Sequence, residues 1–176
     1  MNIRRVVTGH DANGKSVFAS DEEVPGLAFE VLPGWRFFDV WGADETPTFP
    51  DAGEKPEAGT YFPGVGGFRF SFSVIPPEST PPAEGIDEAA AMKEVNAALP
   101  GMMDHLEPDG MHTTDTVDME VIISGEVSLI LDDGEEKVLR AGDTVVQNGT
   151  RHVWRVRGDE PCLMAVFMFG ANRAGA

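Results

Sequence analysis

The chain has 176 residues and a formal net charge of −17, from 13 basic and 30 acidic side chains. Such an acidic surface repels phosphate backbones and anionic lipid headgroups, so neither nucleic acid nor a membrane is expected as a partner. The length is that of one ordinary domain, and an apolar content of 41 % is enough to build a core and excludes wholesale disorder.

Turn-forming residues interrupt short apolar runs along the whole chain, with 20 glycines and 13 prolines, which predicts an all-β fold. Residues 3–20 are expected to form a hairpin, because Asn13-Gly14 is a strong tight-turn signal. Further short strands are predicted at 27–31 and 35–41. The segment 68–74 alternates Phe or Val with Arg or Ser, which predicts a half-buried strand with an apolar and a polar face.

Two segments of the N-terminal half stand apart from this strand pattern. Residues 46–67 contain four prolines and five glycines without any period, which predicts a long loop. This loop could be a lid over a barrel mouth, a plain surface loop or an arm onto a second subunit. Residues 87–99 carry the only helix signal, with Asp87 as the N-cap, Pro100-Gly101 as the stop and an apolar stripe of Met92, Val95 and Leu99.

Short strands separated by turn signals every five to ten residues follow in the C-terminal half, which predicts a sandwich or a barrel. They are expected at 119–123, 127–131, 137–140, 144–147, 152–157 and 162–169. No repeat or linker divides the chain, so residues 1–176 are interpreted as one domain. In that domain residues 1–100 supply strands, loop and helix, and residues 101–176 supply the main barrel strands.

The cysteine content and the N-terminus indicate a cytoplasmic protein. Cys162 is the single cysteine, so no intrachain disulfide can form, which fits a reducing compartment. The chain turns polar at Thr8 without an apolar signal core, and no apolar stretch approaches the ~20 residues of a membrane span. Cys162 lies in an apolar run and is expected to be buried and unreactive.

Histidine, the commonest neutral metal ligand, occurs at four positions: His10, His105, His112 and His152. His112 begins a polar stretch that runs into a predicted buried strand, which is where a polar interior site would be built. His152 begins another strand, with Trp154 on the same face. His105 is interpreted as a loop residue and His10 as an exposed residue beside the hairpin.

The stretch from Gly110 to Val156 resembles the two sequence motifs of the cupin superfamily. In the first motif, the first histidine falls on His112 and the second on Thr114. The acidic position of that motif falls on Asp118 and its closing glycine on Gly125. The wording of both motifs is also similar to that of a subgroup of small bacterial and fungal cupins, most of which have no assigned reaction.

The second motif opens at Gly142 and leads through Gly149 to its histidine, which falls on His152. Here the chain departs from the family pattern: Gln147 replaces the proline and Val156 the final asparagine. In the first motif, likewise, Leu106 replaces an expected glycine. The glycines, the strands and three of the four ligand positions match.

The resemblance implies a double-stranded β-helix, or cupin jelly-roll barrel, to which the residue pattern adds an N-terminal hairpin arm and one short helix. It also implies a homodimer and one divalent transition metal, Fe, Zn, Mn or Ni, held by His112, Asp118 and His152. Two histidines and one carboxylate form the set that holds non-haem iron with open positions, although ligand type alone does not choose the metal. Degenerate cupins bind a small molecule in the same pocket without metal.

Four further residues of the motifs are expected to lie beside the metal or to line the pocket. Glu120 shares strand parity with Asp118, so it is the alternative carboxylate ligand or a catalytic general base beside the metal. Thr114 is a poor ligand but a fair hydrogen-bond donor behind the metal. Gln147 and Trp154 are expected to line the pocket.

Two functions follow for the pocket. The first is a metal-dependent enzyme for a small organic molecule, oxygen-rich or carboxylated, of the dioxygenase, decarboxylase or isomerase class. The second is a non-catalytic cupin that binds or senses a small molecule. A DNA-binding role is not expected, since the sequence shows neither a helix-turn-helix pair nor a basic stretch.

Overall fold

Strands dominate the computed structural model, which describes residues 2–175. A hairpin of β1 (Ile3–His10) and β2 (Ser16–Val24) stands beside two larger sheets. The five-stranded sheet has the order β3-β4-β10-β5-β8 and the three-stranded sheet the order β7-β6-β9. Their strands are β3 (Arg36–Ala43), β4 (Phe68–Ile75), β5 (Thr116–Ser124), β6 (Glu126–Ile130), β7 (Glu136–Arg140), β8 (Thr144–Asn148), β9 (Val153–Arg155) and β10 (Cys162–Gly170).

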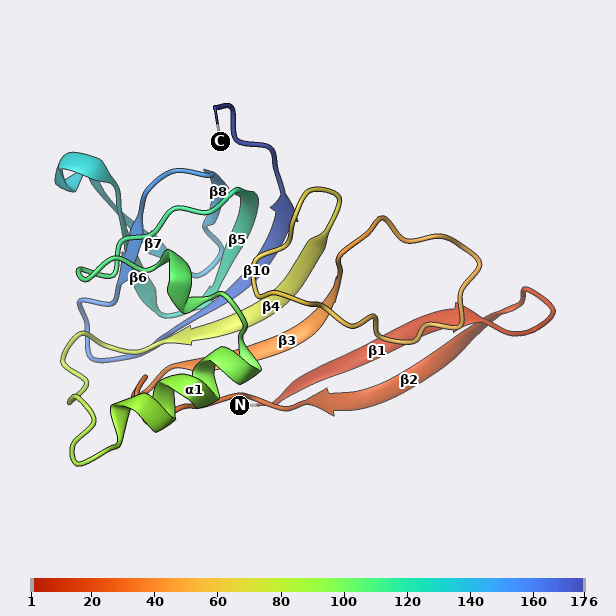
Figure 1. Ribbon diagram of the computed structural model, residues 1–176, viewed down its shortest axis with the longest axis horizontal. Helices are drawn as coiled ribbons and strands as arrows, with labels where there is room; N and C mark the ends of the chain where they lie inside the picture. The colour runs from red at the N-terminus through yellow and green to blue at the C-terminus, as the bar shows by residue number, and fades with distance from the viewer. Residues whose placement is uncertain (1, 176) are drawn as a thin grey trace.

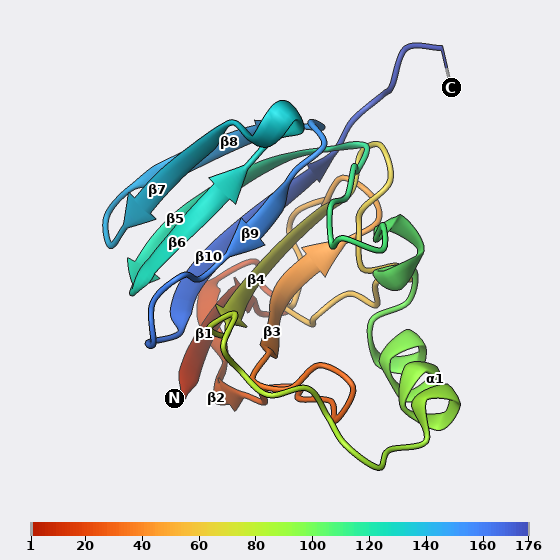
Figure 2. The same cartoon turned by 90° about the vertical axis from the view of Figure 1, so that its left-hand side faces the viewer.

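The two larger sheets face each other and enclose one apolar core (Figure 2). The core draws on both sheets, with Ile75, Ile122, Val127, Leu129, Trp154, Val156, Cys162, Met164, Val166 and Met168. All described strand pairs within the sheets are antiparallel. The predicted all-β fold, a double-stranded β-helix, is therefore confirmed, and Cys162 is buried as expected.

The hairpin of β1 and β2 projects from the barrel as an arm (Figure 1). The loop that follows β3 runs back along it, and the His10 N–H donates to the Asp51 carbonyl over 2.7 Å. The backbone of Gly9 lies so close to Ala52 that an added Cβ would stand 2.3 Å from the Ala52 oxygen. The first part of the 46–67 loop is therefore packed against the arm rather than over the barrel.

Residues 2–175 contain one α-helix, α1 (Glu88–Ala98), which packs against one side of β3. The Asp87 side chain accepts a hydrogen bond from the Ala90 N–H, which confirms the predicted N-cap. The buried Val95 and Leu99 pack with Phe29 and Phe37 in a second apolar cluster. No helix within residues 2–175 is long and apolar enough to cross a membrane.

The strand predicted at 27–31 does not form. Only Leu27 pairs with a strand residue, Phe37, through an isolated bridge. The segment instead turns after that bridge, with the Leu32 N–H donating to the Phe29 carbonyl over 3.1 Å. The turn places Phe29 against the helix, so the apolar run that predicted a strand serves the second apolar cluster.

The alternating strand β4 has the opposite orientation to the one that its pattern suggests. Arg69, Ser71 and Ser73 are buried inside the barrel, whereas Phe68, Phe70, Phe72 and Val74 lie half-buried on the outer face of the sheet. The inner face of this strand therefore carries polar side chains, and its outer face carries the phenylalanines. Alternation gave the period of the strand but could not assign its two faces.

Buried Arg69 ties the segment before the 46–67 loop and the last part of the loop itself to the barrel. Its Nη1 donates to the Ala43 carbonyl over 2.9 Å and its Nη2 to the Thr60 carbonyl over 2.8 Å. The same guanidinium forms an ion pair with Asp44. The end of the loop is thus fixed beside the barrel interior.

Replacing Arg69 by methionine is expected to lower the free energy of unfolding by about 2–3 kcal/mol, because buried carbonyl groups lose their donors. Urea denaturation measures this change. Arg4→Met is the matched control, since the Arg4–Asp21 pair is exposed and such pairs contribute little to stability. Equal losses in the two variants would contradict the role assigned to Arg69.

Candidate functional site

Two histidines face each other across an antiparallel bridge inside the barrel. The His112 N–H donates to the His152 carbonyl over 2.9 Å, and the His152 N–H donates to the His112 carbonyl over 3.0 Å. Their rings therefore extend to the same side, with centroids 4.2 Å apart. The bridge brings together two residues that are 40 positions apart in the chain.

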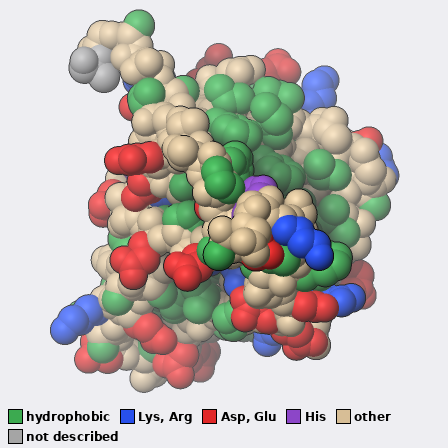
Figure 3. All heavy atoms as spheres, turned by 90° about the vertical axis from the view of Figure 1, so that its right-hand side faces the viewer, with side chains coloured by type: hydrophobic (Ala, Val, Ile, Leu, Met, Phe, Trp, Pro, Cys, Tyr) green, Lys and Arg blue, Asp and Glu red, His purple; other side chains and the backbone are tan. Residues whose placement is uncertain are grey.

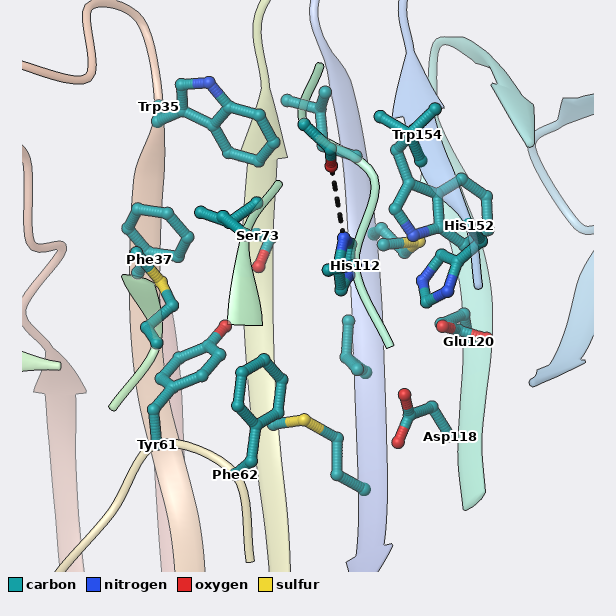
Figure 4. Close-up of a pocket in the computed structure, with 18 of the residues that line it drawn as sticks. Trp35, Phe37, Tyr61, Phe62, Ser73, His112, Asp118, Glu120, His152 and Trp154 are labelled. Atoms are coloured by element: carbon teal, nitrogen blue, oxygen red, sulfur yellow. Dashed lines mark hydrogen bonds between the residues drawn. The ribbon is translucent and has the colours of Figure 1, made fainter. Parts of the chain in front are cut away.

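Backbone carbonyls fix the orientation of both rings. His152 Nδ1 lies 2.9 Å from the Thr150 oxygen, and His112 Nδ1 lies 3.3 Å from the Gly110 oxygen (dashed in Figure 4). A carbonyl only accepts, so each Nδ1 carries the proton and each Nε2 presents a lone pair. A hydrogen bond from Nδ1 to a carbonyl is the arrangement that orients a histidine for metal binding through Nε2.

Two carboxyl groups from β5 enter the same cavity. Asp118 and Glu120 lie on the inner face of the strand and are 6 % and 3 % exposed. Within residues 2–175, Asp118 Oδ1 and Glu120 Oε2 are buried without a hydrogen-bond partner. Buried polar atoms are normally paired, so these two oxygens have the capacity to bind a further group.

Burial controls the ionisation of the site. It raises the pKa of Asp118 to about 6, and burial together with the Asp118 charge raises the pKa of Glu120 to about 8. Burial also lowers the pKa of His112, and burial with the neighbouring His112 lowers the pKa of His152 to about 4. At neutral pH both imidazoles are therefore neutral, as metal ligands must be, and Glu120 holds a proton.

These four side chains line a cavity of about 310 Å³. Its other walls are largely apolar and include the aromatic residues Trp35, Phe37, Tyr61, Phe62 and Trp154. The face of the molecule in Figure 3 carries more acidic than basic side chains, in line with the net charge of −17. An apolar cavity with a few converging polar groups is the usual form of a small-molecule site.

The donor set of the cavity fits a divalent transition metal in its chemistry: two neutral imidazoles and two buried carboxyl groups. No three His, Cys, Asp or Glu side chains among the described residues, however, lie close enough together to hold a metal ion. The predicted ligands His112, Asp118 and His152 do line one cavity, and the rings of the two histidines are in contact. The metal itself stays a prediction.

The three further residues predicted for the pocket lie at different depths. Trp154 lines the cavity, with its ring 6.0 Å from the His152 ring in an edge-to-face contact. Thr114 and Gln147 are buried but are not among the residues that line it. The Thr114 hydroxyl contacts the Thr116 hydroxyl at 2.7 Å, and Gln147 accepts from the Thr150 hydroxyl over 2.7 Å.

The sequence did not identify the opposite wall of the cavity, which includes Tyr61 and Phe62 from the end of the 46–67 loop. The Tyr61 N–H donates to the Pro100 carbonyl over 2.8 Å, which holds this wall against the end of the helix segment. Burial raises the pKa of Tyr61 to about 12, so its hydroxyl stays protonated. The only signal in the sequence was the length of the loop, which allowed a lid but named no residue.

Several known proteins similar to this chain are named as fungal biosynthesis cluster proteins or as cupin-domain-containing oxidoreductases. The chain is 34 % identical over 169 residues to phomopsin biosynthesis cluster protein C' of Diaporthe leptostromiformis, a match that covers 93 % of this chain and 76 % of that protein. It is 26 % identical over 154 residues to the cupin-domain-containing oxidoreductase fogC of Aspergillus ruber, covering 86 % and 63 %.

No family model matches the chain. Among solved structures, a cupin 2 conserved barrel domain protein from Salinispora arenicola superposes with a TM-score of 0.45 and 16 % identity, over 86 % of this chain and 92 % of that one. A cupin-domain-containing oxidoreductase of Neurospora crassa, srdB, is 28 % identical over 89 % of this chain and 67 % of its own length. The motifs, the barrel and these relatives together show that the chain belongs to the cupin superfamily.

Proposed function

We propose that the chain is a metal-dependent enzyme that acts on a small oxygen-bearing organic molecule. One observation carries the proposal: two backbone-oriented histidines and two buried carboxyl groups without partners enter one aromatic cavity. The similarity to proteins named cupin-domain-containing oxidoreductases supports an oxidoreductase reaction. Dioxygenase, decarboxylase and isomerase chemistry all use such a centre.

His112, His152 and Asp118 would hold the metal, with Glu120 as the alternative carboxylate ligand. A bound divalent metal would supply a Lewis acid that polarises an oxygen of the substrate. The chain's own residues do the rest of the work. The aromatic walls exclude water and position the molecule, and Glu120 holds a proton at its carboxyl oxygen for transfer to or from the substrate.

A metal titration tests this proposal. The metal-free protein is titrated with Fe(II), Mn(II), Zn(II) and Ni(II) by calorimetry under anaerobic conditions, and the metal content of the purified protein is measured by elemental analysis. We expect one equivalent of one of these metals. Failure of all four metals to bind would reject the proposal.

A non-catalytic binding protein is the second candidate function. The size and aromatic lining of the cavity favour it, because both suit an organic ligand whether or not a metal is present. Thermal shift separates the two functions: stabilisation by organic ligands but by none of the four metals would support the binding protein.

We also propose that the chain forms a homodimer through the outer face of the five-stranded sheet. An apolar row runs across four strands of that face, from Val146 through Met119 and Phe167 to Phe70, each residue facing the next in the strand register. The Phe70 and Phe167 rings stack with centroids 4.2 Å apart. Val146 is 60 % exposed and Met119 is 46 % exposed, and a contiguous exposed apolar patch marks an interaction surface.

Phe167→Glu is expected to convert this dimer into a monomer at micromolar concentration, since the new charge would be buried in the interface without a partner. Size-exclusion chromatography with light scattering measures the mass. Phe18→Glu is the control, because Phe18 is 80 % exposed but lies on the hairpin arm. A wild-type chain that is already monomeric at this concentration would contradict the proposal.

A further inference from the structure

A second cavity of about 250 Å³ adjoins the first. The two cavities share five lining residues, which are Leu32, Trp35, Ile75, Trp154 and Arg155. Figure 4 places Trp35 and Trp154 on opposite walls at one end of the first cavity, with Asp118 and Phe62 at the other end. The shared residues therefore lie between the two spaces, and we call them the junction.

We propose that the two cavities form one elongated site, and that the site takes a long neutral molecule with an apolar middle section. The polar end of this ligand lies at the histidine pair, its middle passes between Trp35 and Trp154, and its far end fills the second cavity. This inference rests on the proposed function for the position of the polar end, but the second cavity is defined without reference to a metal.

The junction suits an apolar section because its surface is mostly hydrocarbon. Trp35, Trp154 and Ile75 present apolar groups to both cavities, and burying apolar area there stabilises a bound chain in proportion to its length. Beyond them the second cavity continues between the segments 31–35 and 76–80. Val31, Pro33 and the residues of 76–80 that line it do not line the first cavity.

Charge at the site selects a neutral ligand. Arg155 is the one Lys or Arg side chain among the described residues that line the first cavity. Its guanidinium already lies 3.4 Å from a Glu78 carboxylate oxygen and donates to the Asp109 carbonyl. With two carboxyl groups inside and a net charge of −17 outside, an anionic ligand finds no free cation of the chain in this cavity.

Calorimetry with 1-octanol and 1-dodecanol as probes tests the elongated site on the metal-free protein. The four additional methylenes of 1-dodecanol should lie beyond the tryptophan pair, where Glu78 and Thr80 stand beside the apolar groups, so it should bind about tenfold more tightly than 1-octanol. Dodecanoate is the charged probe of the same chain length, and it should bind more weakly than 1-dodecanol. Equal affinity for the two alcohols would overturn the proposal.

Filling the second cavity should remove the preference for length. Thr80 lines only that cavity, so Thr80→Trp should bring 1-dodecanol to within about threefold of 1-octanol, whereas Thr80→Val, which conserves shape, should preserve the preference. Pro33→Trp fills the same cavity from another segment and guards against misfolding of the first variant. Two folded filling variants that keep the wild-type preference would also overturn the proposal.

Metal binding separates this result from the proposed function. The filling variants should bind the metal as the wild-type chain does, since neither position lines the first cavity. A chain that binds no metal but prefers 1-dodecanol would reject the enzyme and retain the elongated site. A chain that binds a metal without any preference for length would do the reverse.

Discussion

His152→Ala is expected to weaken metal binding by at least about a hundredfold, because the cavity offers only two imidazole donors among the described residues. His112→Ala should have the same effect, since the two rings lie in contact and are oriented in the same way. Anaerobic calorimetry of the metal-free variants with the metal that binds the wild-type chain measures the loss.

His105→Ala is the matched control. His105 Nδ1 also lies near a backbone carbonyl, 3.1 Å from the Thr113 oxygen, but its side chain is exposed and its ring stacks edge-on against Phe62. We expect wild-type affinity for the metal in this variant. An effect as large as that of His152→Ala would show that the site lies elsewhere.

The same titration identifies the carboxylate ligand. If Asp118 binds the metal, as the motif spacing suggests, Asp118→Asn should weaken binding far more than Glu120→Gln does. If the order is reversed, Glu120 is the ligand. Both side chains are buried on one face of β5, so the two variants are matched for position and environment.

In the metal-free protein, the free energy of unfolding is expected to fall by about 2 kcal/mol as the pH rises from 6.5 to 8. The pKa of Glu120 is about 8 in the folded chain, raised from its ordinary 4.5. Between these values the folded chain holds a proton that the unfolded chain has lost. Stability therefore falls by about 1.4 kcal/mol per pH unit, and the fall ends as the pH passes the folded-state pKa.

The measurement starts at pH 6.5 because Asp118 and His152 change the free energy of unfolding mainly below that pH. Asp118, with a folded pKa of about 6, destabilises the fold only as the pH rises toward that value. The pKa of His152 is lowered from 6.5 to about 4, so its neutral form is favoured in the folded chain. Its contribution to stability is therefore lost as the pH falls from 6.5 toward 4. The two carboxyl groups have the opposite effect, because a fall in pH stabilises the folded chain through them.

Urea denaturation at half-unit steps between pH 6.5 and 8 measures the effect. Glu120→Gln should abolish the slope that Glu120 causes, because glutamine has the same shape and does not titrate. The exposed Glu84, changed to Gln, controls for the loss of one acidic group from a strongly acidic chain. A slope that is the same in wild type and in Glu120→Gln would show that Glu120 is ionised at neutral pH.

Local signals in the sequence identified most of the elements of this fold. The Asn13-Gly14 turn, the Asp87 cap and the turns between the C-terminal strands depend on neighbouring residues, so they were visible without the fold. His112, Asp118 and His152 were identified through the two motifs, and the structure places all three at one cavity. Glu120 followed from strand parity with Asp118.

The tertiary structure alone decided which face of each strand meets the interior. In β4 the polar side chains point inward and the phenylalanines outward, because the barrel supplies Arg69 with carbonyl partners and the outer sheet face is itself apolar. Likewise, Phe29 is not part of a strand, because it packs against the apolar side of a helix some sixty residues later in the chain. Neither partner is adjacent in the sequence.

The sequence by itself determined that the chain is a β-barrel with two histidines and a carboxylate at motif spacing. Only the tertiary structure decided what surrounds them: the aromatic wall of Tyr61 and Phe62, the junction at Trp35 and the second cavity. The physical reason is that motifs and turns arise from interactions between near neighbours in the chain. The cavity is instead bounded by residues up to 136 positions apart, from Leu32 to Met168, whose proximity depends on the packing of the whole domain.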